Sequence, residues 1–121
     1  MGLFDFTDLV LQRGLQGAGL RQQLLSNNLA NANTAGFKRS DVDFESSLSA
    51  ALSSNDPTQA AEGVSFQPQT DTTSAMTPDG NNVDVDQELS NLTENSVEYQ
   101  ALAAIERSRL QMLQTAMGGT P

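Results

Sequence analysis

The stretch that decides the fold reads SNNLANANTAGFKR and occupies residues 26–39 of a 121-residue chain. It follows a run in which apolar residues recur every three or four positions: Leu11, Leu15, Ala18, Leu25, Leu29 and Ala32. That spacing predicts an amphipathic helix from about Thr7 to Asn31. Asn and Gly tolerate the positive φ of a helix C-terminus, so the segment from Asn31 to Gly36 should end the helix, with positive φ at Gly36.

The first half of this helix contains three glycines, Gly14, Gly17 and Gly19. Each glycine weakens an isolated helix by about 1 kcal/mol relative to alanine. We therefore expect this half to be helical only where another element packs on it. Thr7 or Asp5 is the expected N-cap.

The C-terminal helix is the clearest element predicted. Asp84 is placed to cap it, with Gln87 in the capping-box position, and the helical pattern runs from Val85 to Met117 before Gly118-Gly119 stops it. Apolar residues fall on two stripes, so a single partner helix would leave apolar surface exposed. One stripe contains Leu89, Leu92, Ser96, Tyr99, Ala103, Leu110, Leu113 and Met117, and the other contains Leu102, Ile105, Met112 and Ala116.

The middle of the chain, residues 37–82, is expected to be extended and loop-rich. Phe44, Leu48 and Leu52 predict one short helix capped by Asp43, and residues 53–82 read as a long polar loop in which Val64 and Phe66 are candidates for a brief strand. The expected fold is dominated by α-helix. Two terminal segments, 1–36 and 83–121, form long helices that pair as an antiparallel, coiled-coil-like hairpin.

The composition excludes several classes of function. The chain has no Cys and no His, which removes thiolate nucleophiles, imidazole bases and His/Cys zinc sites. Residues 41–98 hold twelve acidic residues and no Lys or Arg, so nucleic-acid binding is not expected. The acids between Asp79 and Glu88 lack the order of an EF-hand. We predict no catalytic residue, metal or cofactor, no cleaved secretion signal and no direct membrane insertion.

Residues 26–39 resemble the N-terminal signature of the flagellar basal-body rod and hook proteins, the axial proteins of the flagellum. The segments Asp41–Phe44 and Gly80–Asp86, the latter leading through Glu94–Gln100, resemble the small proximal-rod members in particular. Ala35 stands where many members have Pro, and Phe37 stands where the proximal-rod type often has Tyr.

The resemblance implies a structural, non-enzymatic rod subunit. Such subunits are exported unfolded by the flagellar type III apparatus without a cleaved signal, and they polymerise in the periplasm through their terminal helices. The implied partners are copies of the chain itself, other rod proteins, and the inner-membrane ring, adapter and export-gate proteins. The alternatives are another small rod subunit of the same family, or a coiled-coil adapter or export chaperone that never polymerises.

Two sets of residues are the candidates for assembly. The turn set consists of Asn27, Asn28, Leu29, Ala30, Asn31, Asn33, Thr34, Gly36 and Phe37. The helix-packing set consists of Leu11, Leu15, Leu25, Leu89, Leu92, Tyr99, Leu102, Ile105, Leu110, Met112 and Leu113. The asparagines could cap and turn the chain locally or form a hydrogen-bond ladder between subunits, and both roles can hold together. Charge segregation further suggests that Arg107 or Arg109 pairs with the acidic middle of a neighbouring subunit.

Overall fold

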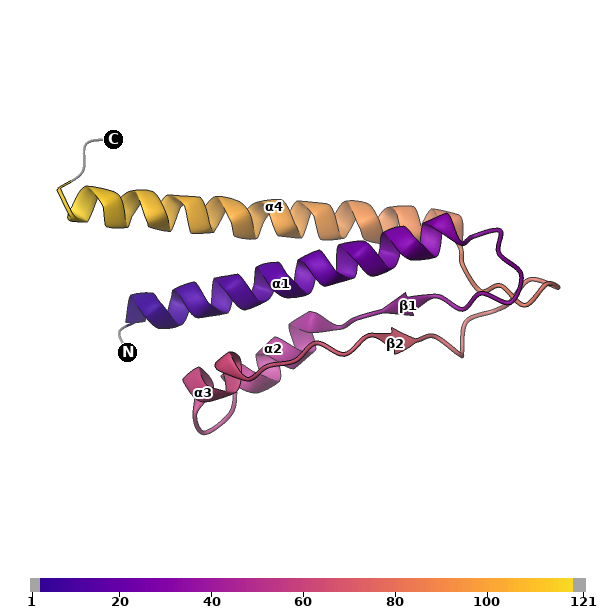
Figure 1. Cartoon of the computed structure of the whole chain (residues 1–121), viewed down its shortest axis with the longest axis horizontal. Helices are drawn as coiled ribbons and strands as arrows, with labels where there is room; N and C mark the ends of the chain where they lie inside the picture. Colours follow the sequence, from indigo (N-terminus) through magenta and orange to yellow (C-terminus); the bar gives the residue numbers. More distant parts are fainter. Residues whose placement is uncertain (1–2, 119–121) are drawn as a thin grey trace.

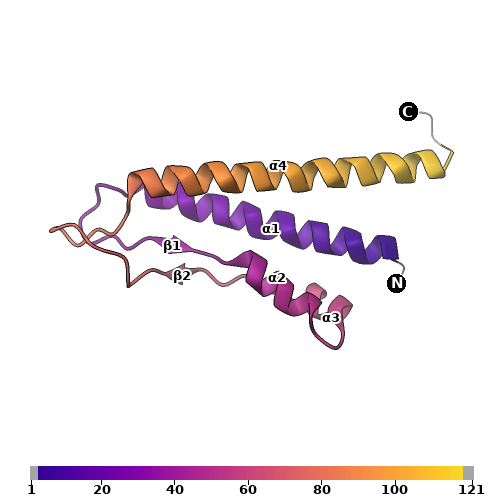
Figure 2. The same ribbon diagram turned by 180° about the vertical axis from the view of Figure 1, so that it is seen from behind.

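A computed structural model describes residues 3–118 of the chain and shows a helical hairpin with an added layer (Figure 1). The elements are α1 (Leu3–Ala30), β1 (Ser40–Asp41), α2 (Phe44–Leu52), α3 (Pro57–Glu62), β2 (Gln69–Thr70) and α4 (Val85–Ala116). α1 is the middle layer, with the antiparallel α4 on one side and α2, α3 and the strands on the other, as Figures 1 and 2 both show. The predicted pairing of two long terminal helices is confirmed.

The start of α1 differs from the prediction. The helix is already formed at Leu3, so Thr7 and Asp5 lie inside it and the N-cap prediction was wrong. The half-buried Phe6 extends the apolar face backward by a turn, and Asp5 places negative charge in the first turn, where the helix dipole favours it. The other end of α1, Ala30, is within one residue of the prediction.

α4 has the predicted bounds and the predicted cap. The Asp84 carboxylate accepts a hydrogen bond from the backbone N–H of Gln87 at 3.2 Å. The Gln87 side chain donates through its Nε2 to Asn91 Oδ1 at 3.1 Å, one turn further along the helix. Gly118 follows the helix with a φ of 83°, while Gly119 lies outside the described residues.

The middle segment confirms one prediction and corrects two. Asp43 caps α2 as expected, accepting from Ser46 N at 3.1 Å. The loop predicted for 53–82 contains α3, which begins at Pro57 after an Asp56 cap. The short strand is not at Val64 and Phe66 but at Gln69–Thr70, where Thr70 pairs with Ser40 and Gln69 with Asp41 of β1. Phe66 packs instead edge-on against Phe44, with ring centroids 6.2 Å apart.

The apolar core is thin and depends on close approach to α1. Its buried members are Leu11, Ala18, Leu25, Val42, Phe44, Ala51 and Ala61. A Cβ placed on Gly17 would lie 2.5 Å from Phe44 Cβ and Cγ, so α2 can pack this closely only against glycine. A Cβ on Gly14 would lie 3.3 Å from Leu102 Cδ1. The glycine-rich half of α1 therefore has two packing partners, α2 and α4.

Candidate assembly site

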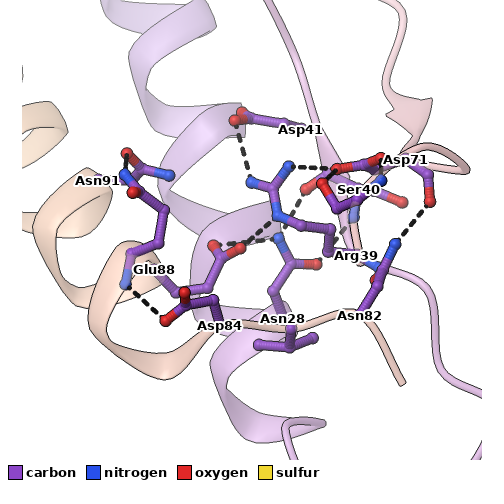
Figure 3. Close-up of polar contacts among 12 residues, drawn as sticks. Asn28, Arg39, Ser40, Asp41, Asp71, Asn82, Asp84, Glu88 and Asn91 are labelled. Carbon is purple, nitrogen blue, oxygen red and sulfur yellow. Dashed lines mark hydrogen bonds and ion pairs between the residues drawn. The ribbon is translucent and has the colours of Figure 1, made fainter. Parts of the chain in front are cut away.

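Polar side chains occupy the closed end of the hairpin, where the chain leaves α1 and enters α4 (Figure 3). We call this cluster the polar joint. It consists of Asn28 on α1, Arg39 and Asp41 at β1, Asp71 after β2, Asn82 before α4, and Glu88 on α4. Within the described chain, the side chains of Asn28, Asn82 and Glu88 are buried. Polar groups at such depth cost free energy unless they are hydrogen-bonded, so their partners decide what the cluster does.

Asn28 joins α1 to β1 through the backbone of Ser40. Its Nδ2 donates to the Ser40 carbonyl at 2.7 Å, and its Oδ1 accepts from the Ser40 N–H at 2.9 Å. One side-chain amide thus satisfies both backbone groups of a strand residue, as a neighbouring strand would. Nδ2 also lies 3.3 Å from Glu88 Oε2, which ties the same side chain to α4.

Arg39 provides the positive charge at the centre of the joint. Its Nε donates to Glu88 Oε1, and its terminal nitrogens lie 3.2 Å from Asp41 and 3.5 Å from Asp71. The Glu88 side chain is only 1% exposed, so Arg39 compensates a carboxylate that has almost no contact with water. Burial has the largest single effect and opposes the charge on Arg39, but the hydrogen bonds and negative charges of Glu88 and Asp41 together outweigh it, and the pKa of Arg39 is raised.

Arg21 extends this ion-pair network back along α1. Its Nε lies 2.9 Å from Asp41 Oδ1, and this hydrogen bond raises the pKa of the Arg21 guanidinium. Burial has the largest single effect and would raise the pKa of Asp41, but the hydrogen bonds from Arg21, the Val42 N–H and Arg39, with the charge of Arg21, together lower it below its ordinary value. Two arginines, Arg21 and Arg39, thus engage the Asp41 carboxylate, which suits a structural role.

The residues that precede α4 form hydrogen bonds with the turn that follows α1. Asn81 Nδ2 donates to the carbonyls of Asn31 at 2.9 Å and Thr34 at 2.8 Å. Gly36 has a φ of 74°, which confirms the predicted positive value, and its N–H donates to the Asp79 carbonyl at 2.8 Å. Carbonyls that a helix end leaves without partners are thus satisfied by residues about 50 positions later.

The predicted turn residues divide into inward and outward groups. Asn28 is buried and bonded within the chain, so its amide does not face another subunit. Asn31 acts locally: its Nδ2 donates to the Asn27 carbonyl at 2.8 Å and its Oδ1 accepts from Thr34 Oγ1 at 3.1 Å. Leu29 and Phe37 are half-buried. The exposed members are Asn27, Ala30, Asn33, Thr34 and Gly36.

The helix-packing residues divide in the same way. Leu11 and Leu25 are buried, and Leu15, Leu92 and Leu102 are half-buried. The remaining members lie on α4 and expose between 37% and 56% of their surface: Leu89, Tyr99, Ile105, Leu110, Met112 and Leu113. The expectation that one partner helix leaves apolar surface on α4 is confirmed. Between residues 3 and 118, no helix is both long and apolar enough to cross a membrane.

Sequence reasoning missed four residues that hold the hairpin together: Arg39, Asn81, Glu88 and Asn95. Asn95 is fully buried on α4, and its Nδ2 donates at 2.8 Å both to the Ala18 carbonyl and to Gln22 Oε1. A signal existed, because Glu88 and Asn95 are seven residues apart and share a helix face with Leu92. Polar residues on an otherwise apolar face indicate buried hydrogen bonds between helices.

Comparison with known proteins connects this architecture to one family. The family model described as flagella basal body rod protein matches residues 9–38, which cover most of α1 and the turn. The flagellar basal body rod protein FlgB of Bacillus subtilis (strain 168) is 32% identical, with 98% of each chain aligned. FlgB of Aeromonas hydrophila is 32% identical over 96% of each chain, and FlgB of Escherichia coli (strain K12) is 30% identical over 89% of this chain and 91% of its own. The chain therefore belongs to the FlgB family of flagellar basal body rod proteins.

Proposed function

We propose that this chain is a non-enzymatic structural subunit of the flagellar basal-body rod, and that it assembles through the exposed apolar residues of α4. The observation that carries the proposal is the contrast between the two faces of α4. One face is used against α1, while Leu89, Ile105, Met112 and their neighbours expose apolar surface that a single chain does not cover. Burying such surface between subunits contributes roughly 25 cal/mol per Å² to assembly.

The three segments take different roles in this proposal. Residues 1–36 and 83–121 form the helices that pack between subunits, and residues 37–82 cover the other side of α1. The polar joint fixes the two helices against each other at the closed end. Its carboxylates are engaged by Arg21 and Arg39, so we assign them to structure and not to acid–base catalysis.

The location and route follow from the family. We propose that the chain reaches the periplasmic rod through the flagellar type III apparatus without a cleaved signal. We further propose that it contacts other rod proteins and the inner-membrane ring, adapter and export-gate proteins. The thin core supports this route, because a chain with few buried apolar side chains costs little to unfold for export.

The test compares two charged substitutions on α4 in a strain that lacks the chromosomal copy. Ile105→Asp adds charge to the exposed apolar surface, and Gln111→Asp adds the same charge at an exposed polar position. Because both sites are exposed, both chains should fold equally well by circular dichroism. We expect Ile105→Asp to abolish rods in electron micrographs of basal bodies and Gln111→Asp to leave them intact.

Retention of a labelled wild-type chain in purified basal bodies distinguishes a rod subunit from an export chaperone. A rod subunit stays in purified basal bodies at a fixed number of copies, whereas an adapter or export chaperone is lost on purification. Complete rods that contain no labelled chain would refute the proposal.

A further inference from the structure

An apolar groove lies where α1, α2 and α4 come together. Its volume is about 250 Å³, and its apolar lining includes Val10, Leu48, Leu52 and Leu102. We call it the three-helix groove. Val10, Leu48, Leu52 and Leu102 are all half-buried, so each presents part of its apolar surface to the groove. The groove is open at the molecular surface and could accept apolar side chains from outside.

The edge of the groove is acidic. Glu45 of α2 and Glu98 of α4 line it, and their carboxyl groups are hydrogen-bonded to each other. Burial and then the charge of Glu45 raise the pKa of Glu98. The positive charge of Arg21 acts on Glu98, but its guanidinium is engaged by Asp41 at 2.9 Å. Two acidic groups that share a hydrogen bond at the edge of an apolar groove favour a ligand that is apolar and positively charged.

The end of α4 has that chemistry. Leu110, Leu113 and Met117 follow one another at helical spacing and are 54%, 37% and 82% exposed. Arg107 is exposed and lies three residues before Leu110, on the same side of the helix. The end of the α4 ribbon extends past the start of α1 (Figure 1), and the three apolar side chains of this stripe keep between 37% and 82% of their surface exposed.

We propose that the three-helix groove of one copy receives the Arg107–Met117 end of α4 from a second copy. Leu110 and Leu113 enter the groove, and Arg107 reaches the carboxylates of Glu45 and Glu98. A chain cannot fill its own groove this way, because Leu102 of the same straight helix already lines it and Arg107 lies about 7.5 Å further along the axis.

This inference rests on the proposed rod function and names the contact that would propagate the rod. The donating surface differs from the receiving surface, so the contact is heterologous. Repeated heterologous contacts that do not close into a ring produce an open helical filament, which is the geometry that a rod requires.

Charge exchange tests the contact in the purified chain. Arg107→Glu and Glu98→Arg should each raise the dissociation constant for self-association at least fivefold in concentration-dependent sedimentation, since each replaces an attraction with a repulsion. Combining both changes in one chain should restore the dissociation constant to within twofold of wild type. Glu62→Arg changes an exposed acid at the end of α3 and should have no effect. Circular dichroism checks that every variant folds.

Disulfide formation tests the geometry, because the natural chain has no Cys. A Ser49→Cys chain carries a thiol at the groove, and a Gln114→Cys chain carries one beside the Leu110–Met117 stripe. Their mixture should oxidise to a mixed dimer at least fivefold faster than a mixture of Gln114→Cys with Ser90→Cys, an exposed position near the other end of α4.

The inference is overturned if the wild-type chain stays monomeric at every concentration, if the double charge exchange fails to restore association, or if Ser90→Cys links as fast as Ser49→Cys. Basal bodies separate this failure from that of the proposed function. Rods that hold labelled Arg107→Glu chain at the wild-type level refute the groove contact alone. Rods that never contain the labelled wild-type chain refute the proposed function.

Discussion

Replacing Gly17 with alanine tests how closely α2 packs on α1. The added Cβ would lie 2.5 Å from Cβ and Cγ of Phe44 and 2.6 Å from Cδ2. Carbon atoms make favourable contacts at about 3.5–4.0 Å, so α2 has to move away by about 1 Å. The Cβ of Phe44 is fixed to the backbone, which means that a change of side-chain rotamer cannot relieve the overlap.

The expected change in the free energy of unfolding of Gly17→Ala follows from two opposing effects. Overpacking of this kind costs about 1–3 kcal/mol. Alanine is about 1 kcal/mol better than glycine inside a helix, which offsets part of that cost. The Gly17→Ala chain should therefore lose up to about 2 kcal/mol of its free energy of unfolding, measured by urea denaturation followed by circular dichroism at neutral pH.

Two other glycines of α1 are matched controls in the same helix. The nearest atom to a Cβ on Gly19 is Tyr99 Cε2 at 4.0 Å, so Gly19→Ala should gain about 0.5–1 kcal/mol from helix propensity. A Cβ on Gly14 would meet Leu102 Cδ1 at 3.3 Å, which is the end of a flexible side chain, and Gly14→Ala should fall between the other two. A Gly17→Ala chain as stable as Gly19→Ala would show that Phe44 does not pack on Gly17.

Three further predictions concern the polar groups. Asn28→Ala should lower the free energy of unfolding by about 2–4 kcal/mol in urea, because it leaves buried groups without partners, whereas the exposed Asn27→Ala should stay within about 0.5 kcal/mol. Arg39→Ala should lower the free energy of unfolding by about 3–5 kcal/mol in the same assay, because the Glu88 carboxylate stays buried without its cation. Arg39→Lys should restore only part of that stability. In the folded chain the carboxyl group of Glu106 is hydrogen-bonded to Asp8 of α1, and this hydrogen bond, followed by burial, raises the pKa of Glu106. Ionisation of Glu106 therefore destabilises the fold as the pH rises through that pKa. Glu106→Gln should therefore raise the melting temperature at pH 7 and leave it unchanged below about pH 4.

The sequence was sufficient for α2, for α4 and for the end of α1, because their determinants are local. The bounds of α4 follow from Asp84 and from an apolar pattern that persists over 32 residues. The end of α1 follows from Asn31 and Gly36, whose backbone preferences act within one turn. The same applies to Asp43, which caps α2 through the N–H of a residue three positions later.

The elements that sequence reasoning missed depend on contacts between distant residues or are too short to show a period. α3 has six residues, fewer than two helical turns, so its apolar spacing is not distinguishable from that of a loop. β1 and β2 have two residues each and pair across about 30 positions. Asn28 was missed as a buried group because an asparagine near a helix end has the same local signature whether it caps the helix or reaches Ser40.

The two ends of the hairpin differ in the kind of side chain that lies between or beside the helices. At the closed end, Asn28 and Arg39 both donate to the buried carboxylate of Glu88, so sliding α4 by one turn would take Glu88 away from both partners. Burying an uncompensated charge is strongly destabilising, whereas an apolar contact tolerates small shifts, so polar groups fix the register better than leucines do. At the open end, Leu110 and Leu113 are exposed, so they do not fix the register of α4 against α1. The chain thus fixes the register of its two long helices with polar contacts and leaves apolar surface exposed on α4, which is the surface that the proposed assembly would bury.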